Sequence, residues 1–169
     1  MIDRAIDRAM RAIVLGLGLL FIAAVCLNFA NVVGRYVFGK AIFGADEVQT
    51  YIMVWMAFAG AVVVSWRGAH LRMDVLVTRL PGRVRTALRV AELVLIAVTA
   101  AVVFAQSWNY VAQMAAMGRR SDAASIPMAL PHAAVAVGFG LMAVLAVFAL
   151  WRMARPVAPA QPGGAETRP

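Results

Sequence analysis

Four long stretches of the chain consist almost entirely of apolar residues, and charged residues lie near their ends. The stretches cover residues 12–33, 48–66, about 90–118 and about 132–151. A helix needs roughly 20 mostly apolar residues to cross the hydrocarbon core of a bilayer. The pattern therefore predicts an all-α integral membrane protein with four transmembrane helices, and we expect residues 1–155 to form this membrane domain.

The third apolar stretch is expected to belong to a longer helix. If the helix runs from Arg83 to Met117, it is about 50 Å long at a rise of 1.5 Å per residue. This length exceeds the hydrocarbon core of roughly 30 Å. We therefore expect the helix to be tilted or to project from the bilayer.

Composition supports membrane insertion. The chain is 63% apolar and 14% charged, whereas a soluble domain carries about 25% charged residues. The formal net charge is +8, but the arginines flank the apolar stretches and form no compact patch with interleaved aromatic residues. A nucleic acid partner is therefore not expected.

The basic residues also predict the orientation. An even number of spans places both termini on one side, and the segments on that side contain Arg4, Arg8, Arg11, Arg67, Arg72, Arg79, Arg83, Arg85, Arg89, Arg152, Arg155 and Arg168. The two loops on the other side contain only Arg35, Lys40, Arg119 and Arg120. Because cytoplasmic loops carry the excess of Lys and Arg, this asymmetry predicts cytoplasmic N- and C-termini.

The two ends of the chain differ in character. The first apolar stretch is too long for the apolar region of a signal peptide, and we expect a retained helix. Residues 156–169 are rich in proline and glycine. They are expected to form a disordered cytoplasmic tail.

The segment between the second and third spans has an amphipathic pattern. Its apolar positions follow helical spacing, while Arg72, Arg79 and Arg83 fall on another face. This predicts an interfacial helix with its arginines near anionic membrane lipids, although packing against a partner protein explains the pattern equally well. His70 and Asp74 share a helical face here, as a surface pair or as a partner contact.

Several polar residues lie at or near the other membrane face. Asn28 and Asn31 are three residues apart and share a helix face, which favours interhelical hydrogen bonds, with a direct ligand role as the alternative. Arg35 follows the first span, and Asp46 and Glu47 precede the second. These charges either lock the local topology or dock an external protein.

The sequence gives little support for a disulfide, a haem, a zinc site or a catalytic site. Cys26 is the only cysteine, so no internal disulfide is expected. His70 and His132 are predicted on opposite membrane faces, where they cannot share a haem iron, and no Cys/His cluster suits zinc. We therefore expect no cofactor, metal or catalytic site in this chain. Small residues instead predict close helix packing at Ala57, Gly60, Ala61, Gly138 and Gly140.

A series of short motifs resembles a known family. The motifs are Asn28-x-x-Asn31-x-x-Gly34-Arg35-Tyr36-Val37-Phe38-Gly39, Gly44-Ala45-Asp46-Glu47, Tyr51-x-x-x-Trp55, Gly60-Ala61, His70-x-x-x-Asp74, Ser125-Ile126-Pro127-Met128-x-Leu130-Pro131 and Gly138-Phe139-x-Leu141-Met142. Their order, over about residues 10–152, resembles the small DctQ-type membrane subunit of tripartite ATP-independent periplasmic (TRAP) transporters. Many members carry a tryptophan where this chain has Phe43-Gly44-Ala45.

This resemblance implies a role and partners. The chain would be a subunit in the bacterial inner membrane that scaffolds a large membrane subunit and helps dock a periplasmic solute-binding protein for organic-acid uptake. The large subunit would hold the sodium and solute sites. The resemblance and the residue patterns together make Asn28, Asn31, Arg35, Asp46, Glu47, Trp55, His70 and Asp74 the candidates for subunit contact or docking.

Two other functions remain as alternatives. An autonomous dimeric exporter would need an ionisable residue deep in a span, and the one candidate, Glu92, lies near a helix end. A membrane redox subunit would need a haem, which the placement of the two histidines disfavours.

Overall fold

The computed structural model describes residues 2–67 and 81–154. This part of the chain forms four helices: α1 (Ile2–Val37), α2 (Ala45–Arg67), α4 (Gly82–Ala116) and α5 (Ala129–Ala154). Each is long and apolar enough to cross a membrane. The prediction of an all-helical protein with four membrane-spanning helices is confirmed. The predicted interfacial helix, the tail, His70 and Asp74 lie outside the described residues.

Two of the helices are much longer than a bilayer core requires. α1 has 36 residues and α4 has 35, which gives each a length of about 50–55 Å. Pro81 precedes α4 and suits a helix start, because proline has no N–H to leave unpaired. The length predicted for the helix from Arg83 to Met117 is confirmed to within one residue at each end.

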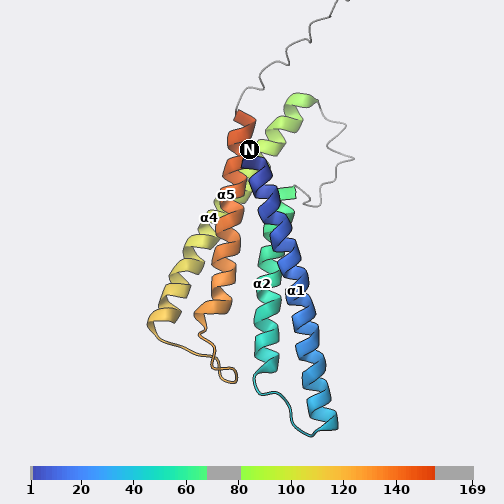
Figure 1. The fold of residues 1–169 in the computed structure, drawn as a ribbon. Coiled ribbons are helices and arrows are strands. Elements are labelled where there is room, and N and C mark those ends of the chain that lie inside the picture. Colours follow the sequence, from blue (N-terminus) through green and yellow to red (C-terminus); the bar gives the residue numbers. More distant parts are fainter. Residues whose placement is uncertain (1, 68–80, 155–169) are drawn as a thin grey trace, which may run out of the picture.

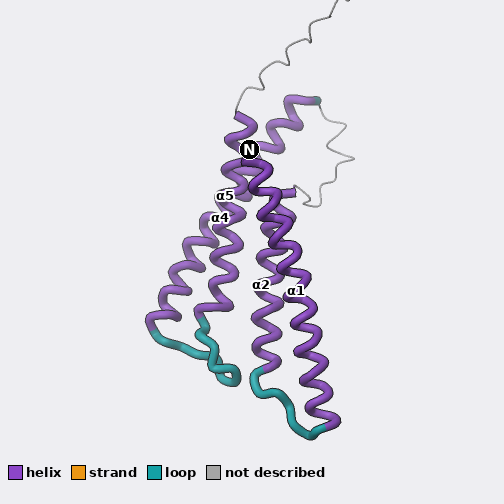
Figure 2. Tube along the Cα trace, in the orientation of Figure 1, coloured by secondary structure: helices purple, strands orange, loops and turns teal. Residues whose placement is uncertain are grey.

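The helices pack as neighbours in the order α1, α2, α5, α4. Extended contacts join α1 to α2, α2 to α5, and α5 to α4. The start of α1 and the end of α5 lie at the same end of the molecule (Figures 1 and 2). The inner helices, α2 and α5, thus have a neighbour on each side, and α1 and α4 form the two flanks.

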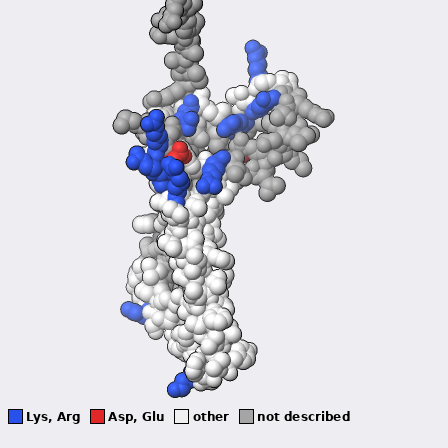
Figure 3. All heavy atoms as spheres, turned by 45° about the vertical axis from the view of Figure 1, so that its right-hand side comes forward, with Lys and Arg blue, Asp and Glu red and all other residues white. Residues whose placement is uncertain are grey.

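Charge distinguishes the two ends of the helices. Most lysine and arginine side chains in the described part gather where α1 begins (Figure 3). We call this the arginine end; it contains Arg4, Arg8, Arg11, Arg67, Arg83, Arg85, Arg89 and Arg152. We call the opposite end the loop end; it contains the connections 38–44 and 117–128. The basic residues that the sequence places on one side of the spans therefore also lie together at one end of the folded helices.

A small core joins three helices near the arginine end. Met10 of α1 packs with Val62 and Val63 of α2, and all three are buried. Partly buried apolar residues from α1, α2 and α5 surround them: Ile6, Ile13, Trp66, Met142 and Leu145. The indole Nε1 of Trp66 also donates a hydrogen bond of 2.7 Å to Asp7. These contacts attach the first turns of α1 to the end of α2.

The glycines predicted to allow close helix packing do not behave alike. A Cβ atom at Gly138 of α5 would lie 2.8 Å from the Cβ atom of Phe58 in α2, and one at Gly140 would lie 3.0 Å from the ring of Phe104 in α4. At Gly60 a Cβ atom would meet nothing within 4 Å. Close packing is therefore confirmed at Gly138 and Gly140 in α5, whereas the prediction is wrong at Gly60, where an added Cβ atom would have open space around it.

Most of the apolar helix surface is not covered by the chain itself. Within the most apolar window of each helix, 6% of residues are buried in α1 and in α4, and 22% in α5. Large side chains such as Leu15, Leu19 and Leu95 are about 70% exposed. Such surfaces require lipid or another membrane protein around them.

Candidate functional site: the loop end

Asn31 connects α1 to the start of α2. Its side chain is 6% exposed. The Nδ2 group donates to Oδ1 of Asp46 at 3.3 Å, and the Oδ1 atom accepts from the backbone N–H of Ile42 at 2.9 Å. One amide thus holds both the loop and the helix that follows it.

Asn28 makes a second interhelical bond one turn earlier. Its Nδ2 group donates to Oε1 of Gln49 in α2 at 2.9 Å. The hydrogen bonds predicted for Asn28 and Asn31 are therefore present, but the two residues differ in burial. Asn28 is exposed and lines an open cavity of about 700 Å³ between α1 and α2, together with apolar side chains such as Phe29 and Met53.

Arg35 and Asp46 form an ion pair across the same loop. The closest nitrogen–oxygen distance is 3.8 Å, and the two side chains are 53% and 80% exposed. An exposed pair of this kind contributes little stability, typically less than about 1 kcal/mol. The pair therefore orients the loop weakly and leaves both charges accessible at the surface.

Glu47 links α2 to the connection between α4 and α5. One carboxylate oxygen accepts the backbone N–H of Ala123 at 3.1 Å, and the other accepts that of Ala124 at 2.7 Å. Gly44 supports this arrangement, because it has φ +78° and a Cβ atom there would lie 2.9 Å from the Cα atom of Ala124. The two connections of the loop end are thus fastened to each other.

The connection that Glu47 holds has its own hydrogen-bonded structure. The N–H of Ser121 donates to the carbonyl of Ile126 at 2.8 Å, and the N–H of Ile126 donates back to the Ser121 hydroxyl at 3.1 Å. The N–H of Met128 donates to the carbonyl of Arg119 at 2.9 Å. Sequence reasoning missed Ala123 and Ala124, because backbone donors leave no side-chain signature, and it did not single out Ser121 either.

Trp55 lies beneath this connection. It is half-buried and lines a cavity of about 350 Å³ with Tyr51, Ile126 and Leu130. The Tyr51 hydroxyl donates to the sulfur of Met128 at 3.5 Å. The structure thus brings together Asn28, Asn31, Arg35, Asp46, Glu47 and Trp55 at or near one end, while their role in contacting another protein stays a prediction.

Metal-binding chemistry is not evident in the described part of the chain. Among residues 2–67 and 81–154, no three His, Cys, Asp or Glu side chains are grouped as a metal site. His132 packs edge-on against the ring of Tyr110, with ring centres 4.8 Å apart. This contact ties the start of α5 to the last turns of α4.

The geometry defines a class: a multi-pass membrane protein whose helices are joined at one end by two connections that pack against each other. Residues 24–156 match the family described as tripartite ATP-independent periplasmic transporters, DctQ component. The chain therefore belongs to the DctQ family and is the small permease subunit of a TRAP transporter, as its motifs indicated.

Several relatives agree with this assignment. The ectoine TRAP transporter small permease protein TeaB of Halomonas elongata is 29% identical over 147 residues, which cover 87% of this chain and 75% of TeaB. The C4-dicarboxylate TRAP transporter small permease protein DctQ of Vibrio cholerae is 32% identical over 88 residues, or 52% of this chain and 38% of that protein. The isethionate TRAP transporter permease protein DctMQ of Oleidesulfovibrio alaskensis is 27% identical over 99 residues, covering 59% of this chain and 16% of that protein.

Proposed function

We propose that this subunit transports no solute by itself and instead scaffolds a large, sodium-coupled membrane subunit. The observation that carries the proposal is the continuity of the four described helices. Secondary transporters bind ions and solutes at broken helices, where free carbonyls and helix ends line a cavity. α1, α2, α4 and α5 are each unbroken. The predicted spans 12–33, 48–66, 90–118 and 132–151 contain Asp, Glu, Lys, Arg or His only at Glu92 and His132, which lie near the ends of their spans.

Two further observations support a large membrane partner. The flanking helices α1 and α4 present apolar side chains that the chain itself does not cover. In addition, a relative of this chain is the permease DctMQ, of which the matched region makes up only 16%. A region like this chain can therefore be part of a much longer permease. This favours a permanent association of this chain with a large membrane subunit.

We also propose an orientation in the bacterial inner membrane. The arginine end faces the cytoplasm, in accord with the positive-inside rule, and both chain termini lie there. The loop end then faces the periplasm. Its exposed charges, Arg35 and Asp46, become accessible to a periplasmic solute-binding protein, while Glu47 and Asn31 hold the loops in place for it.

Reconstitution tests the scaffold role. Proteoliposomes containing this chain alone, or this chain with the large subunit, receive the binding protein and a sodium gradient. Uptake of ectoine, C4-dicarboxylates and isethionate, the solutes named in the relatives, is then measured along with other organic acids. We expect uptake only with both membrane subunits present. Sodium-driven uptake by the chain alone would refute the scaffold role.

A point variant tests docking separately. Arg35→Gln removes an exposed charge from the last turn of α1. Lys40→Gln removes one from the connection that follows and serves as a matched control. If Arg35 contacts the binding protein, its replacement raises the concentration of binding protein needed for half-maximal uptake and leaves co-purification with the large subunit unchanged. Equal behaviour of the two variants would argue against a docking role for Arg35.

A further inference from the structure

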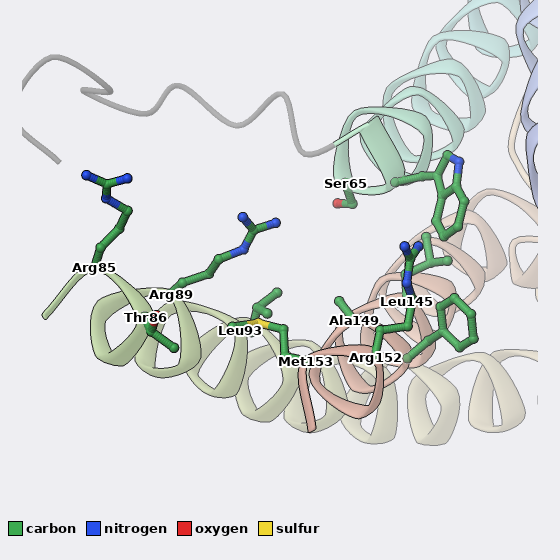
Figure 4. A pocket seen from close by; sticks show the side chains of 11 residues that line it. Ser65, Arg85, Thr86, Arg89, Leu93, Leu145, Ala149, Arg152 and Met153 are labelled. Carbon is green, nitrogen blue, oxygen red and sulfur yellow. The ribbon is translucent and has the colours of Figure 1, made fainter. Parts of the chain in front are cut away.

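A cavity of about 550 Å³ opens at the arginine end, between α2, α4 and α5. Three arginines line it: Arg85 and Arg89 from the first turns of α4, and Arg152 from the last turn of α5. Arg89 and Arg152 extend from different helices toward the end of α2 at Ser65 (Figure 4). Positive charge from two helices thus converges on one space.

The polar half of the cavity suits an oxyanion. A guanidinium group has five N–H donors in a planar fork, which matches the oxygens of a phosphate. Arg85, Arg152 and Ser65 have interactions of their own within the chain, but such interactions need not use all five donors of an arginine. Glu92, one turn beyond Arg89, is not among the residues lining the cavity.

The other half of the cavity is apolar. Leu93 follows Arg89 by one helical turn, and Leu145 and Phe148 of α5 line the same space. Leu93 and Leu145 lie farther along their helices toward the middle of the membrane than Arg89 and Arg152 do. A ligand that fills the whole cavity therefore has an anionic group at the bilayer surface and a hydrocarbon portion directed inward.

A second cavity, of about 670 Å³, adjoins the first and shares Trp66 and Arg152 with it. It adds Arg11 and Arg67 to the basic surroundings. Its one acidic residue, Asp7, already accepts the hydrogen bond from the Trp66 indole. Among the described residues that line the two cavities, arginines therefore outnumber acidic residues around Arg152.

We propose that the cavity between α2, α4 and α5 binds an anionic phospholipid, with the headgroup phosphate on Arg89 and Arg152 and an acyl chain against Leu93, Leu145 and Phe148. A free phosphate satisfies the arginines but leaves the apolar half empty, so the amphipathic lining favours the lipid. On the orientation proposed above, this lipid belongs to the cytoplasmic leaflet, whose surface is negatively charged.

Native mass spectrometry of the full chain in detergent tests the site. The chain is titrated with phosphatidylglycerol and, separately, with phosphatidylcholine of the same acyl chains, and apparent dissociation constants are compared. We expect tighter binding of phosphatidylglycerol. The double variant R89Q/R152Q should weaken phosphatidylglycerol binding about tenfold or more, because two charge-assisted contacts are lost.

Two further variants separate a specific site from diffuse charge attraction and from misfolding. R4Q/R8Q removes the same charge at the same end, but neither residue lines the cavity; its affinity should stay within about twofold of the parent. Leu93→Trp fills the apolar half and keeps every charge, and it should weaken binding as well. Size-exclusion chromatography and circular dichroism verify that each variant is folded.

The other outcomes overturn the proposal. An equal loss of phosphatidylglycerol affinity in R89Q/R152Q and R4Q/R8Q would show that the lipid is attracted diffusely to the arginine end. Equal binding of the two lipids would show an apolar groove without headgroup recognition. Displacement of the lipid by millimolar inorganic phosphate would assign the cavity to a soluble anion. Retention of parental affinity by folded Leu93→Trp would place the lipid elsewhere on the chain.

Discussion

Replacing Gly138 with alanine tests the packing of α5 against α2 directly. Gly138 is buried, and its added Cβ atom would lie 2.8 Å from the Cβ atom of Phe58 and 3.2–3.3 Å from two ring atoms. The Cβ atom of Phe58 is fixed to the backbone, so rotation of the ring cannot relieve the closest contact. The two helices must therefore move apart.

The size of the effect follows from two opposing terms. Overpacking a close contact costs about 1–3 kcal/mol, and replacement of glycine by alanine in a helix returns up to about 1 kcal/mol. Gly138→Ala should therefore destabilise the chain by up to about 2 kcal/mol relative to the parent, and by about 1–3 kcal/mol relative to an alanine variant that gains only the helix term. A Cβ atom at Gly60 would meet nothing within 4 Å, so only the favourable helix term remains. Gly60→Ala should therefore be neutral or stabilising.

Gly140→Ala provides an intermediate case. Its added Cβ atom would meet the ring edge of Phe104 at 3.0–3.1 Å, and the ring can rotate away. Stability of the three variants can be compared by titration with a denaturing detergent, followed by circular dichroism at 222 nm. The expected order of stability is Gly60→Ala, then Gly140→Ala, then Gly138→Ala. Equal stability of Gly138→Ala and Gly60→Ala would refute the proposed contact.

Two further predictions concern the loop end. Glu47→Gln should speed hydrogen–deuterium exchange in a peptide containing Ala123 and Ala124, because an amide offers one acceptor oxygen where the carboxylate offers two. Asp46→Asn is the control. Equal exchange rates in both variants would contradict the role of Glu47 in holding this connection. Asn31→Ala should destabilise the folded chain by about 1–2 kcal/mol, since the N–H of Ile42 loses its acceptor, whereas a similar loss in the exposed Asn28→Ala would argue against a special role for the buried amide.

The sequence predicted the helices well because each apolar stretch is long and its ends are charged. It also predicted that Asn28 and Asn31 hydrogen-bond to another helix, since residues three apart share a face and a polar group inside a bilayer needs a partner. Both results depend on local spacing. Neither required knowledge of which helices are neighbours.

The helix packing and the contact of Glu47 with the connection 117–128 were harder to predict. These helices are apolar on nearly every side, so no amphipathic stripe indicates which face packs, and Gly60 could not be distinguished from Gly138. The partners of Glu47 lie 76 and 77 residues away in sequence and are backbone N–H groups. Such donors occur at every non-proline position, and only the folded chain selects Ala123 and Ala124.

The linear order of the helices has a consequence for the amount of this protein in a cell. In the described part of the chain, α1 and α4 each make extended contacts with one helix only, so lipid or a partner protein must cover their outer sides. A partner that binds only the folded chain stabilises it by mass action. If the large subunit is that partner, we expect copies made in excess of it to unfold and be degraded faster, so that proteolysis matches the abundance of the two subunits.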